Sequence, residues 1–274
     1  INWSFIGDAK TGLADLNAYG KSIGFKKDYS AWHQHVRQLK ASHPMDYDKQ
    51  TPLIQPYEAI ELMSEITDGD AIITTGVGQH QMWAAQYFQY RQPRTWLTSG
   101  SMGTMGFGLP AAIGAAVANP GKTVVDVDGD GSIRMNIGEL ETAVNENIPV
   151  KVLLLNNNGD GMVRQWQKMM FDNRFSGTDK SLHKKDFVKS AEADGYKFAV
   201  RVSDRAQLRG AMEAFLKFEG PAFLEVMIDP DSCVWPMVGP GKGYKDMTVG
   251  PFIKGRRVED APKPQETGVK ADLF

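Results

Sequence analysis

The sequence is poor in cysteine, in net charge and in long apolar runs, and each shortage excludes a class of protein. Cys233 is the single cysteine among 274 residues, so no disulfide within the chain stabilises the fold. This is typical of a reducing compartment, and we expect a cytoplasmic protein, or one in an organelle lumen if the source is eukaryotic. The net charge of −2 argues against general binding to nucleic acid or to a membrane surface. No apolar run approaches the length of a membrane span.

Hydrophobic residues make up 42% of the chain, and they fall in alternating strand-like and helix-like segments. Runs rich in β-branched residues predict strands, and apolar repeats at three- and four-residue spacing predict helices. The predicted strands are residues 71–76, 95–100, 123–128, 150–156, 196–203 and 222–229, and the predicted helices are 56–66, 80–90, 109–118, 137–144, one starting near 162, and 208–216. This alternation predicts an α/β fold with a parallel sheet covered by helices on both faces.

The two ends of the chain differ in pattern from its middle. The sequence begins INWSFIGDAK, without Met or signal-peptide features, and residues 1–6 resemble a strand already under way. We therefore expect residues 1–20 to be the remnant of a preceding domain, and residues 21–55 to be a linker with helical character over 32–39. We expect the main domain over residues 56–235 and a C-terminal tail over 236–274. The polar end of that tail, residues 255–274, is expected to wrap a surface or to be disordered.

The segment DVDGDGSIRMNIGE, residues 126–139, raises the question of a calcium loop. Aspartates at alternate positions and a following glycine match such a loop, but its twelfth position is Ile137, where calcium loops need a bidentate glutamate. A calcium loop also follows a helix, whereas residues 122–125 are strand-like. The segment therefore predicts a strand, a tight turn and a helix, with a cation held by fewer protein oxygens.

Three predicted strands end in glycine-rich or acidic turns, within TTGVGQHQMW, DVDGDGS and LLLNNNGDGMV. The carboxyl ends of parallel strands lie at one edge of a sheet, where ligands bind. Asp130 and Asn157 offer hard oxygen atoms, which suit a Mg²⁺ ion bound alongside phosphate. Helices that begin near Gly78 and Met162 offer free backbone N–H groups to phosphate oxygens. The turns therefore predict one Mg²⁺ ion and one diphosphate, beside an apolar region that contains Met102, Met105, Met162 and Trp166.

Several of these residues also have a purely structural interpretation. Asp126 is expected to cap or solvate a turn, and Asp128 fits a structural role and a supporting role beside the metal equally well. Met162, Trp166 and Met169 match an ordinary core stripe on a helix, which their spacing alone favours. A non-catalytic module that binds calcium or a nucleotide through the same turn stays open on these grounds.

Several motifs together resemble one enzyme family. Gly129-Asp130-Gly131 and Asn156-Asn157, separated by residues 132–155, resemble the thiamine diphosphate fingerprint of the pyruvate oxidase and decarboxylase superfamily. The segments GVGQHQMWAAQ, GTMGFGLPAAIGA, NNGDGMVRQWQ and GPAFLEVMIDPD resemble the large catalytic subunit of acetohydroxyacid synthase, also called acetolactate synthase. The resemblance covers roughly residues 50–240, and residues 1–20 resemble the end of that family's FAD-binding middle domain.

The resemblance implies a site built from the three turns. Asp130 and Asn157 would bind Mg²⁺ through their side chains and Gly159 through its backbone carbonyl, although many relatives carry an acidic residue at that last position. Met105 would fold the cofactor so that its two rings meet. The Gly103 carbonyl would accept a hydrogen bond from the aminopyrimidine ring.

The resemblance also implies the remaining surroundings of the cofactor. Met162, Val163 and Trp166 would face the thiazolium ring and the second substrate. The residues implied around the diphosphate end are Val77, Gly78, Gln79, His80, Gly129, Gly131, Ser132, Asp160 and Gly161.

The activity implied by the resemblance is that of a transferase in branched-chain amino acid biosynthesis. Thiamine diphosphate would release CO₂ from pyruvate and pass the remaining two-carbon carbanion to a second 2-keto acid, pyruvate or 2-ketobutyrate. Another thiamine diphosphate-dependent decarboxylase, oxidase or carboligase is the alternative.

The resemblance further implies that this chain needs partners. In the family, a glutamate from the N-terminal domain of a partner subunit activates the cofactor, and FAD binds mostly outside the part represented here. We therefore expect no catalytic residue in this chain and little or no turnover by the chain alone. We also expect a homodimer or tetramer, with a regulatory subunit as a further candidate partner.

Overall fold

The computed structural model describes residues 4–253, which fall into two compact units. One unit spans Tyr47–Gly250, and the other contains residues 4–46 and 251–253 of the described chain. The expectation for residues 255–274 lies outside the described residues. The domain boundaries predicted at residues 20, 55 and 235 stay predictions.

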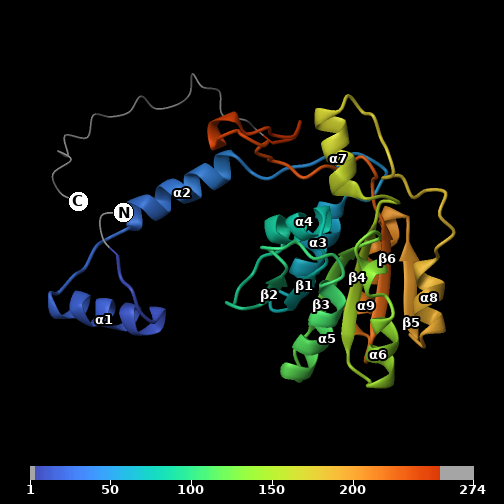
Figure 1. Cartoon of the computed structure of the whole chain (residues 1–274), viewed down its shortest axis with the longest axis horizontal. Helices are drawn as coiled ribbons and strands as arrows, with labels where there is room; N and C mark the ends of the chain where they lie inside the picture. Colours follow the sequence, from blue (N-terminus) through green and yellow to red (C-terminus); the bar gives the residue numbers. More distant parts are fainter. Residues whose placement is uncertain (1–3, 254–274) are drawn as a thin grey trace. The chain divides into compact units, whose positions relative to one another are not determined.

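The unit of residues 47–250 is built on a six-stranded sheet in which all neighbouring strands are parallel, as the sequence predicts (Figure 1). The strand order is β2-β1-β3-β4-β6-β5. The strands are β1 (Ile72–Thr75), β2 (Trp96–Thr98), β3 (Val124–Gly129), β4 (Val150–Asn156), β5 (Phe198–Val202) and β6 (Ala222–Met227). Every residue of β3 and β4 is buried, which explains the largely apolar sequence of β4, whereas β3 also buries Asp126 and Asp128.

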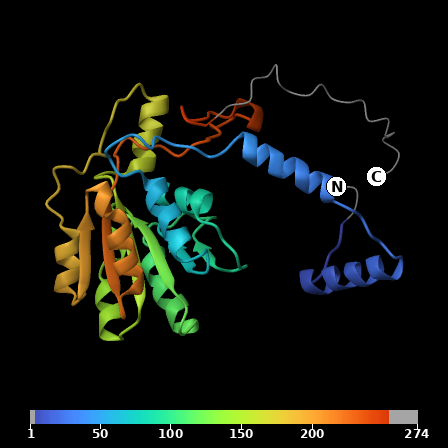
Figure 2. The same cartoon turned by 180° about the vertical axis from the view of Figure 1, so that it is seen from behind.

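Helices enclose this sheet (Figures 1 and 2). Apolar side chains of α5, α6 and α8 share one core with strand residues such as Val124, Val150 and Val152. The helices α4 and α9 also pack on the sheet, and α3 lies against both of them. The helices of this unit are α3 (Pro56–Ile66), α4 (Gln79–Tyr87), α5 (Gly108–Ala118), α6 (Glu139–Asn145), α7 (Gly161–Met170), α8 (Phe187–Ala193) and α9 (Leu208–Lys217).

The small residues of α5 let this helix begin very close to the sheet. A Cβ atom on Gly108 would collide with Oδ1 of Asp126 and would lie 2.5 Å from the backbone nitrogen of Gly76. A glycine is therefore required where α5 meets the end of β1. This close approach brings the segment before α5, which carries Gly103 and Met105, to the same edge of the sheet.

The unit that contains residues 4–46 consists of α1 (Ala9–Ser22) and α2 (Ser30–Ser42), and neither helix has a buried residue. Asp8 caps α1, because its carboxylate accepts the backbone N–H of Thr11 at 3.0 Å. The strand predicted over residues 1–6 is wrong for residues 4–6, which pair with no strand in the described chain, and residues 1–3 lie outside it. The helix α2 lies within the segment predicted as a linker.

The remaining differences from the predicted elements are small. Helix α4 ends at Tyr87 instead of residue 90, because Phe88 is extended and buries its ring. Helix α6 starts at Glu139, after a 3₁₀ turn over Ile133–Met135, so Ile137 precedes it. Helix α8 was not predicted. No helix in the described part of the chain is long and apolar enough to span a bilayer.

Candidate active site

The carboxyl ends of three adjacent strands, β1, β3 and β4, open onto one cavity of about 460 Å³. The residues predicted around the cofactor line this cavity, except Met102, which is exposed, and Trp166. Those that line it are Val77, Gly78, Gln79, His80, Gly103, Met105, Gly129, Asp130, Gly131, Ser132, Asn157, Gly159, Asp160, Gly161, Met162 and Val163. Residues that the sequence did not single out also line it, namely Trp83, Arg134, Met135, Leu155 and Lys180. Trp166 is partly buried on α7 and is not among the lining residues.

Asp130, Asn157 and Gly159 come together at the polar end of this cavity. Asp130 is buried, and the backbone N–H groups of Gly159 and Asn157 donate to its carboxylate. Burial raises the pKa of Asp130 to about 6, while the nearby Lys180 ammonium acts in the opposite direction. The side-chain nitrogen of Asn157 donates to Oε1 of Gln79 at 3.3 Å, so the amide oxygen of Asn157 remains available to a cation.

The donor set at this end fits a magnesium ion. It offers one carboxylate, one amide oxygen and one backbone carbonyl, which are hard ligands in small number. The described residues contain no cluster of three or more His, Cys, Asp or Glu that could enclose a metal without further ligands. A cation here would therefore share its coordination with water and with an anionic group, as Mg²⁺ does when it binds a diphosphate.

His80 lies beneath the glycine-rich turn after β3. It is buried, and burial lowers the pKa of its imidazole to about 3, so the ring is neutral at physiological pH. Its Nε2 atom lies 3.4 Å from Oδ1 of Asp128. A Cβ atom on Gly129 would lie 2.6 Å from Nδ1 of His80, so only glycine fits at this position of the turn.

Asp126 and Asp128 lie inside β3 and are fully buried. Asp126 accepts a hydrogen bond from Oγ1 of Thr74 at 3.1 Å, and burial raises the pKa of its carboxyl well above the ordinary value. The prediction that Asp126 caps or solvates a turn is therefore wrong. Burial also raises the pKa of Asp128 to about 7, opposed by a hydrogen bond from the Ser132 hydroxyl. Asp128 thus contacts His80 and Ser132, which both line the cavity.

The Ser132 hydroxyl joins three segments of the site. Its Oγ atom accepts the backbone N–H of Val77 at 3.1 Å and that of Gly106 at 3.1 Å, and the hydroxyl donates to Asp128. The backbone carbonyl of Gly106 in turn accepts a hydrogen bond from Nδ2 of Asn136 at 2.9 Å. The turn after β1, the turn after β3 and the segment that carries Met105 are thus connected.

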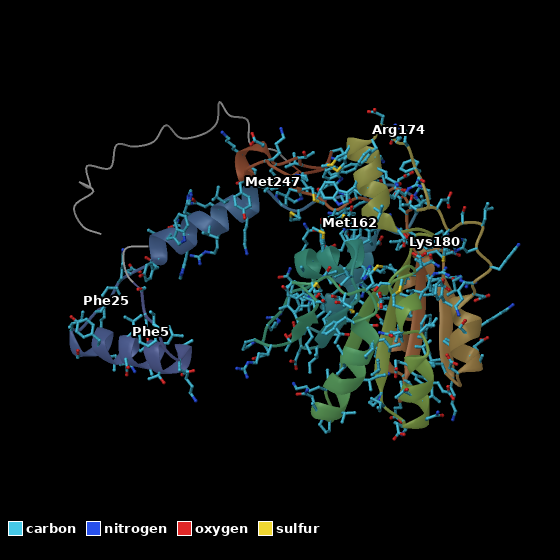
Figure 3. All side chains as sticks on the ribbon, in the orientation of Figure 1. Phe5, Phe25, Met162, Arg174, Lys180 and Met247 are labelled. Atoms are coloured by element: carbon cyan, nitrogen blue, oxygen red, sulfur yellow. The ribbon has the colours of Figure 1, made fainter. Side chains whose placement is uncertain are left out.

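Two glutamines connect α4 to α7 and to the chain after β6. Nε2 of Gln79 donates to Oε1 of Gln165 at 2.9 Å and to the backbone carbonyl of Ser232 at 3.1 Å. Gln165 makes two hydrogen bonds to the backbone of Val234, at 3.0 and 2.8 Å. The Gln79 side chain, which was predicted near the diphosphate, therefore also fixes the start of α7, and α7 carries Met162 to the cavity (Figure 3).

Lys180 reaches the cavity from the connection between α7 and α8. Residues 178–180 run alongside the turn after β4: the N–H of Asp160 donates to the carbonyl of Thr178 at 2.9 Å, and the N–H of Lys180 donates to the carbonyl of Asn158 at 2.8 Å. The Lys180 ammonium forms an ion pair with the Asp160 carboxylate. No local sequence motif identified Lys180, because it reaches the site through this long-range pairing.

Comparisons with known proteins agree with this site. The family described as "Thiamine pyrophosphate enzyme, C-terminal TPP binding domain" matches residues 76–226, which span β3, β4 and the three turns. The chain belongs to this family. Thiamine pyrophosphate is the same molecule as thiamine diphosphate, so the family match supports the expected cofactor.

Among its relatives are acetolactate synthases of plants and yeast. The chain is 45% identical over 252 residues to acetolactate synthase 1, chloroplastic, of Nicotiana tabacum, which covers 89% of this chain and 38% of that protein. It is 43% identical over 259 residues to the mitochondrial acetolactate synthase catalytic subunit of Saccharomyces cerevisiae, covering 92% of this chain and 37% of that protein. The chain thus spans less than half the length of these relatives.

A solved structure supports the fold of this TPP-binding domain. The crystal structure of benzoylformate decarboxylase from Polynucleobacter necessarius superposes with a TM-score of 0.62 over 69% of this chain and 36% of that chain. The sequence identity is 23%, so this similarity speaks for the fold alone.

Proposed function

We propose that the chain forms the Mg²⁺–thiamine diphosphate-binding part of an acetolactate synthase. The whole enzyme would decarboxylate pyruvate and transfer the two-carbon unit to a second 2-keto acid, pyruvate or 2-ketobutyrate, in branched-chain amino acid biosynthesis. The observation that carries this proposal is the single cavity in which the residues predicted around the cofactor, except Met102 and Trp166, meet. The identity of 45% to a protein named acetolactate synthase favours this reaction over those of other thiamine diphosphate enzymes.

In this proposal, the polar end of the cavity holds the metal and the diphosphate. Asp130, the amide oxygen of Asn157 and the carbonyl of Gly159 would hold Mg²⁺, which would neutralise part of the charge of the diphosphate. The first N–H groups of α7, which begins at Gly161, have no partner within the helix and point their partial positive charge toward the anion.

The apolar end of the cavity would surround the reacting part of the cofactor. Bound thiamine diphosphate supplies the carbon nucleophile and the electron sink for decarboxylation and transfer. Met105 supports the folded shape of the cofactor, and Met162 and Val163 exclude water from the reacting carbon. Trp166 does not line the cavity of this chain, and in the complete enzyme it would restrict the room left for the second 2-keto acid.

The proposal includes partners that complete the site. The activating glutamate and most of the FAD site would come from parts of the enzyme beyond the matched region, in a homodimer or tetramer that a regulatory subunit controls. The cytoplasm, or an organelle lumen in a eukaryote, remains our proposed compartment. The plant and yeast relatives carry the words chloroplastic and mitochondrial in their names.

A chimera tests the proposed reaction. This chain would replace the matching 252 residues of the tobacco relative, and the purified protein would be assayed with pyruvate, Mg²⁺, thiamine diphosphate and FAD. We expect acetolactate as the product, no product from the chimera with Asp130→Ala, and little or no product from the 274-residue chain alone.

Each other outcome contradicts a specific part of the proposal. Acetaldehyde or acetyl phosphate in place of acetolactate would indicate another thiamine diphosphate enzyme. Appreciable acetolactate from the chain alone would contradict the division of the site between subunits. Calcium binding without any response to Mg²⁺ plus thiamine diphosphate would favour a non-catalytic module.

A further inference from the structure

The charged side chains that line the cavity differ in the groups with which they form hydrogen bonds and ion pairs. Asp130, Asp160, Arg134 and Lys180 are the charged residues among those that line it. Nε of Arg134 donates to the backbone carbonyl of Asp130 at 2.8 Å, and its guanidinium lies 5.1 Å from the centre of the Phe187 ring. Arg134 is therefore held by a backbone carbonyl and an aromatic face, whereas the Lys180 ammonium is paired with a side-chain carboxylate of the same lining, that of Asp160.

A positive charge in the lining would stabilise a metal–diphosphate group in the cavity. A diphosphate brings more negative charge than one Mg²⁺ ion neutralises once Asp130 is bound to the same ion. Asp160 adds a further negative charge on the same side. The buried imidazole of His80 is neutral and compensates none of it. An uncompensated anion in a buried site is costly, so a cation near the diphosphate would stabilise it beyond what the N–H groups of α7 provide.

Lys180 is held where it can supply that cation. The backbone pairing of residues 178–180 with the metal-binding turn fixes the position of its Cα atom. Its side chain is 12% exposed, against 31% for the side chain of Asp160, with which it forms an ion pair. Figure 3 shows Lys180 and Met162 at the same end of the sheet. The Lys180 ammonium also lowers the pKa of the Asp130 carboxyl, against the effect of burial.

We propose that Lys180 binds the Mg²⁺-bound diphosphate, and that Asp160 holds its ammonium in place until the anion arrives. This inference rests on the proposed function, because it adds a residue to the same cofactor site. A lysine ammonium binds phosphate as a compact charge with three donors, and it can turn from the Asp160 carboxylate to a phosphate oxygen without movement of the backbone.

A different role for the same ion pair would be a purely structural one. In that case Lys180 and Asp160 would only fasten the α7–α8 connection to the turn after β4, and removal of either partner would weaken the site in the same way. The proposed role makes opposite predictions for the two partners, because Asp160 competes with the diphosphate for the lysine and repels the anion.

Calorimetric titration of the 274-residue chain separates the two roles. Mg²⁺ plus inorganic pyrophosphate is the first ligand, and Mg²⁺ plus thiamine diphosphate is the second. We expect Lys180→Met to weaken both affinities by about tenfold or more, Lys180→Arg to retain most of the affinity, and Asp160→Asn to strengthen it. Lys184→Met, an exposed lysine of the same connection, is the matched control and should behave as wild type. Circular dichroism checks that each variant is folded.

The outcomes distinguish this inference from the proposed function. If Asp160→Asn weakens binding as Lys180→Met does, the pair is structural and the inference is wrong. If Lys180→Met binds both ligands as wild type does, the inference also fails, while the proposed cofactor site stands. If neither the wild-type chain nor the chimera described above binds either ligand in the presence of Mg²⁺, the proposed function fails and the inference falls with it. Should Lys180→Met not fold, the stronger binding expected for Asp160→Asn and the retained binding expected for Lys180→Arg still decide the question.

Discussion

At the scale of single residues, the Ser132 hydroxyl illustrates how a site residue can act through other residues. The sequence motif places Ser132 beside the diphosphate, and it does line the cavity. Its Oγ atom, however, already accepts hydrogen bonds from the backbone N–H groups of Val77 and Gly106, and the hydroxyl donates a hydrogen bond to Asp128. The hydroxyl therefore positions the turn after β1 against the segment that carries Met105.

Removal of this hydroxyl should cost both stability and cofactor affinity. Ser132→Ala leaves the buried N–H of Gly106 and the partly buried N–H of Val77 without an acceptor, so we expect the free energy of unfolding to fall by roughly 1–3 kcal/mol. We also expect weaker binding of Mg²⁺–thiamine diphosphate, because two segments of the site lose their connection. Urea unfolding and calorimetric titration measure the two effects, and the exposed Ser101→Ala is the control. A loss of affinity without any loss of stability would instead indicate that the hydroxyl contacts the ligand directly.

At the scale of elements, local patterns predicted the sheet well and its surroundings less completely. The runs at residues 71–76, 123–128 and 150–156 gave β1, β3 and β4, because buried parallel strands need continuous apolar side chains. The turns after these strands predicted Asp130, Asn157 and the helix starts near Gly78 and Met162, and the family resemblance implied the remaining cavity residues that were predicted. Helix α8 escaped prediction, although Asp186 caps it and Phe187 and Ala191 form its buried stripe, since seven residues give a weak periodic signal.

What the sequence could not predict depends on contacts between distant segments. Lys180 reaches the cavity only because residues 178–180 pair with the turn after β4, and no local pattern encodes that pairing. The burial of Asp126 was likewise missed, because an aspartate in a strand-like run more often marks a turn. The strand predicted over residues 1–6 is wrong for residues 4–6, which have no partner strand within the described chain, and a strand without a partner is not stable.

Lys151, near the start of β4, predicts how the stability of the fold depends on pH. Lys151, in β4, is buried and donates from Nζ to the carbonyl of Gly220 at 2.7 Å and to that of Phe218, which connects β4 to the turn after α9. Burial lowers the pKa of Lys151 to about 8. The unfolded chain therefore binds more protons than the folded chain between pH 8 and the ordinary lysine pKa of about 10.4, so stability should rise with pH in this window.

Comparison with a variant isolates this contribution. The difference in unfolding free energy between wild type and Lys151→Met should grow in favour of wild type, by on the order of 1 kcal/mol, as pH rises from 8 to 10. Urea unfolding at several pH values measures it, with Lys217→Met, an exposed lysine at the end of α9, as the control. A difference that does not change with pH would contradict the lowered pKa.

At the scale of the whole molecule, the structure separates a unit that holds the sheet and the cavity from one that holds α1 and α2. Residues 47–250 contain every strand of the sheet and every residue that lines the cavity. The helices α1 and α2 bury none of their residues, so they add little to the apolar burial that stabilises the fold.

A fragment of residues 47–250 should consequently fold by itself. We expect its thermal midpoint to lie within about 3 °C of that of the 274-residue chain, and its affinity for Mg²⁺–thiamine diphosphate to be the same within a factor of about two. Differential scanning calorimetry and titration check the two expectations. A large drop of the midpoint would mean that the terminal segments contribute to the core.

Because all six strands are parallel, the connections of the sheet fall into two sets, at opposite edges, and we expect only one of them to tolerate insertions. The connections that line the cavity follow the carboxyl ends of strands, except for the segment of Lys180, which runs beside the turn after β4. The loops that enter the strands lie at the opposite edge, and a side chain on Gly121, in the loop before β3, would meet nothing within 4 Å. That loop is consequently the place to graft a peptide epitope, a dye or an affinity handle for immobilisation, because such an addition stays remote from the chemistry.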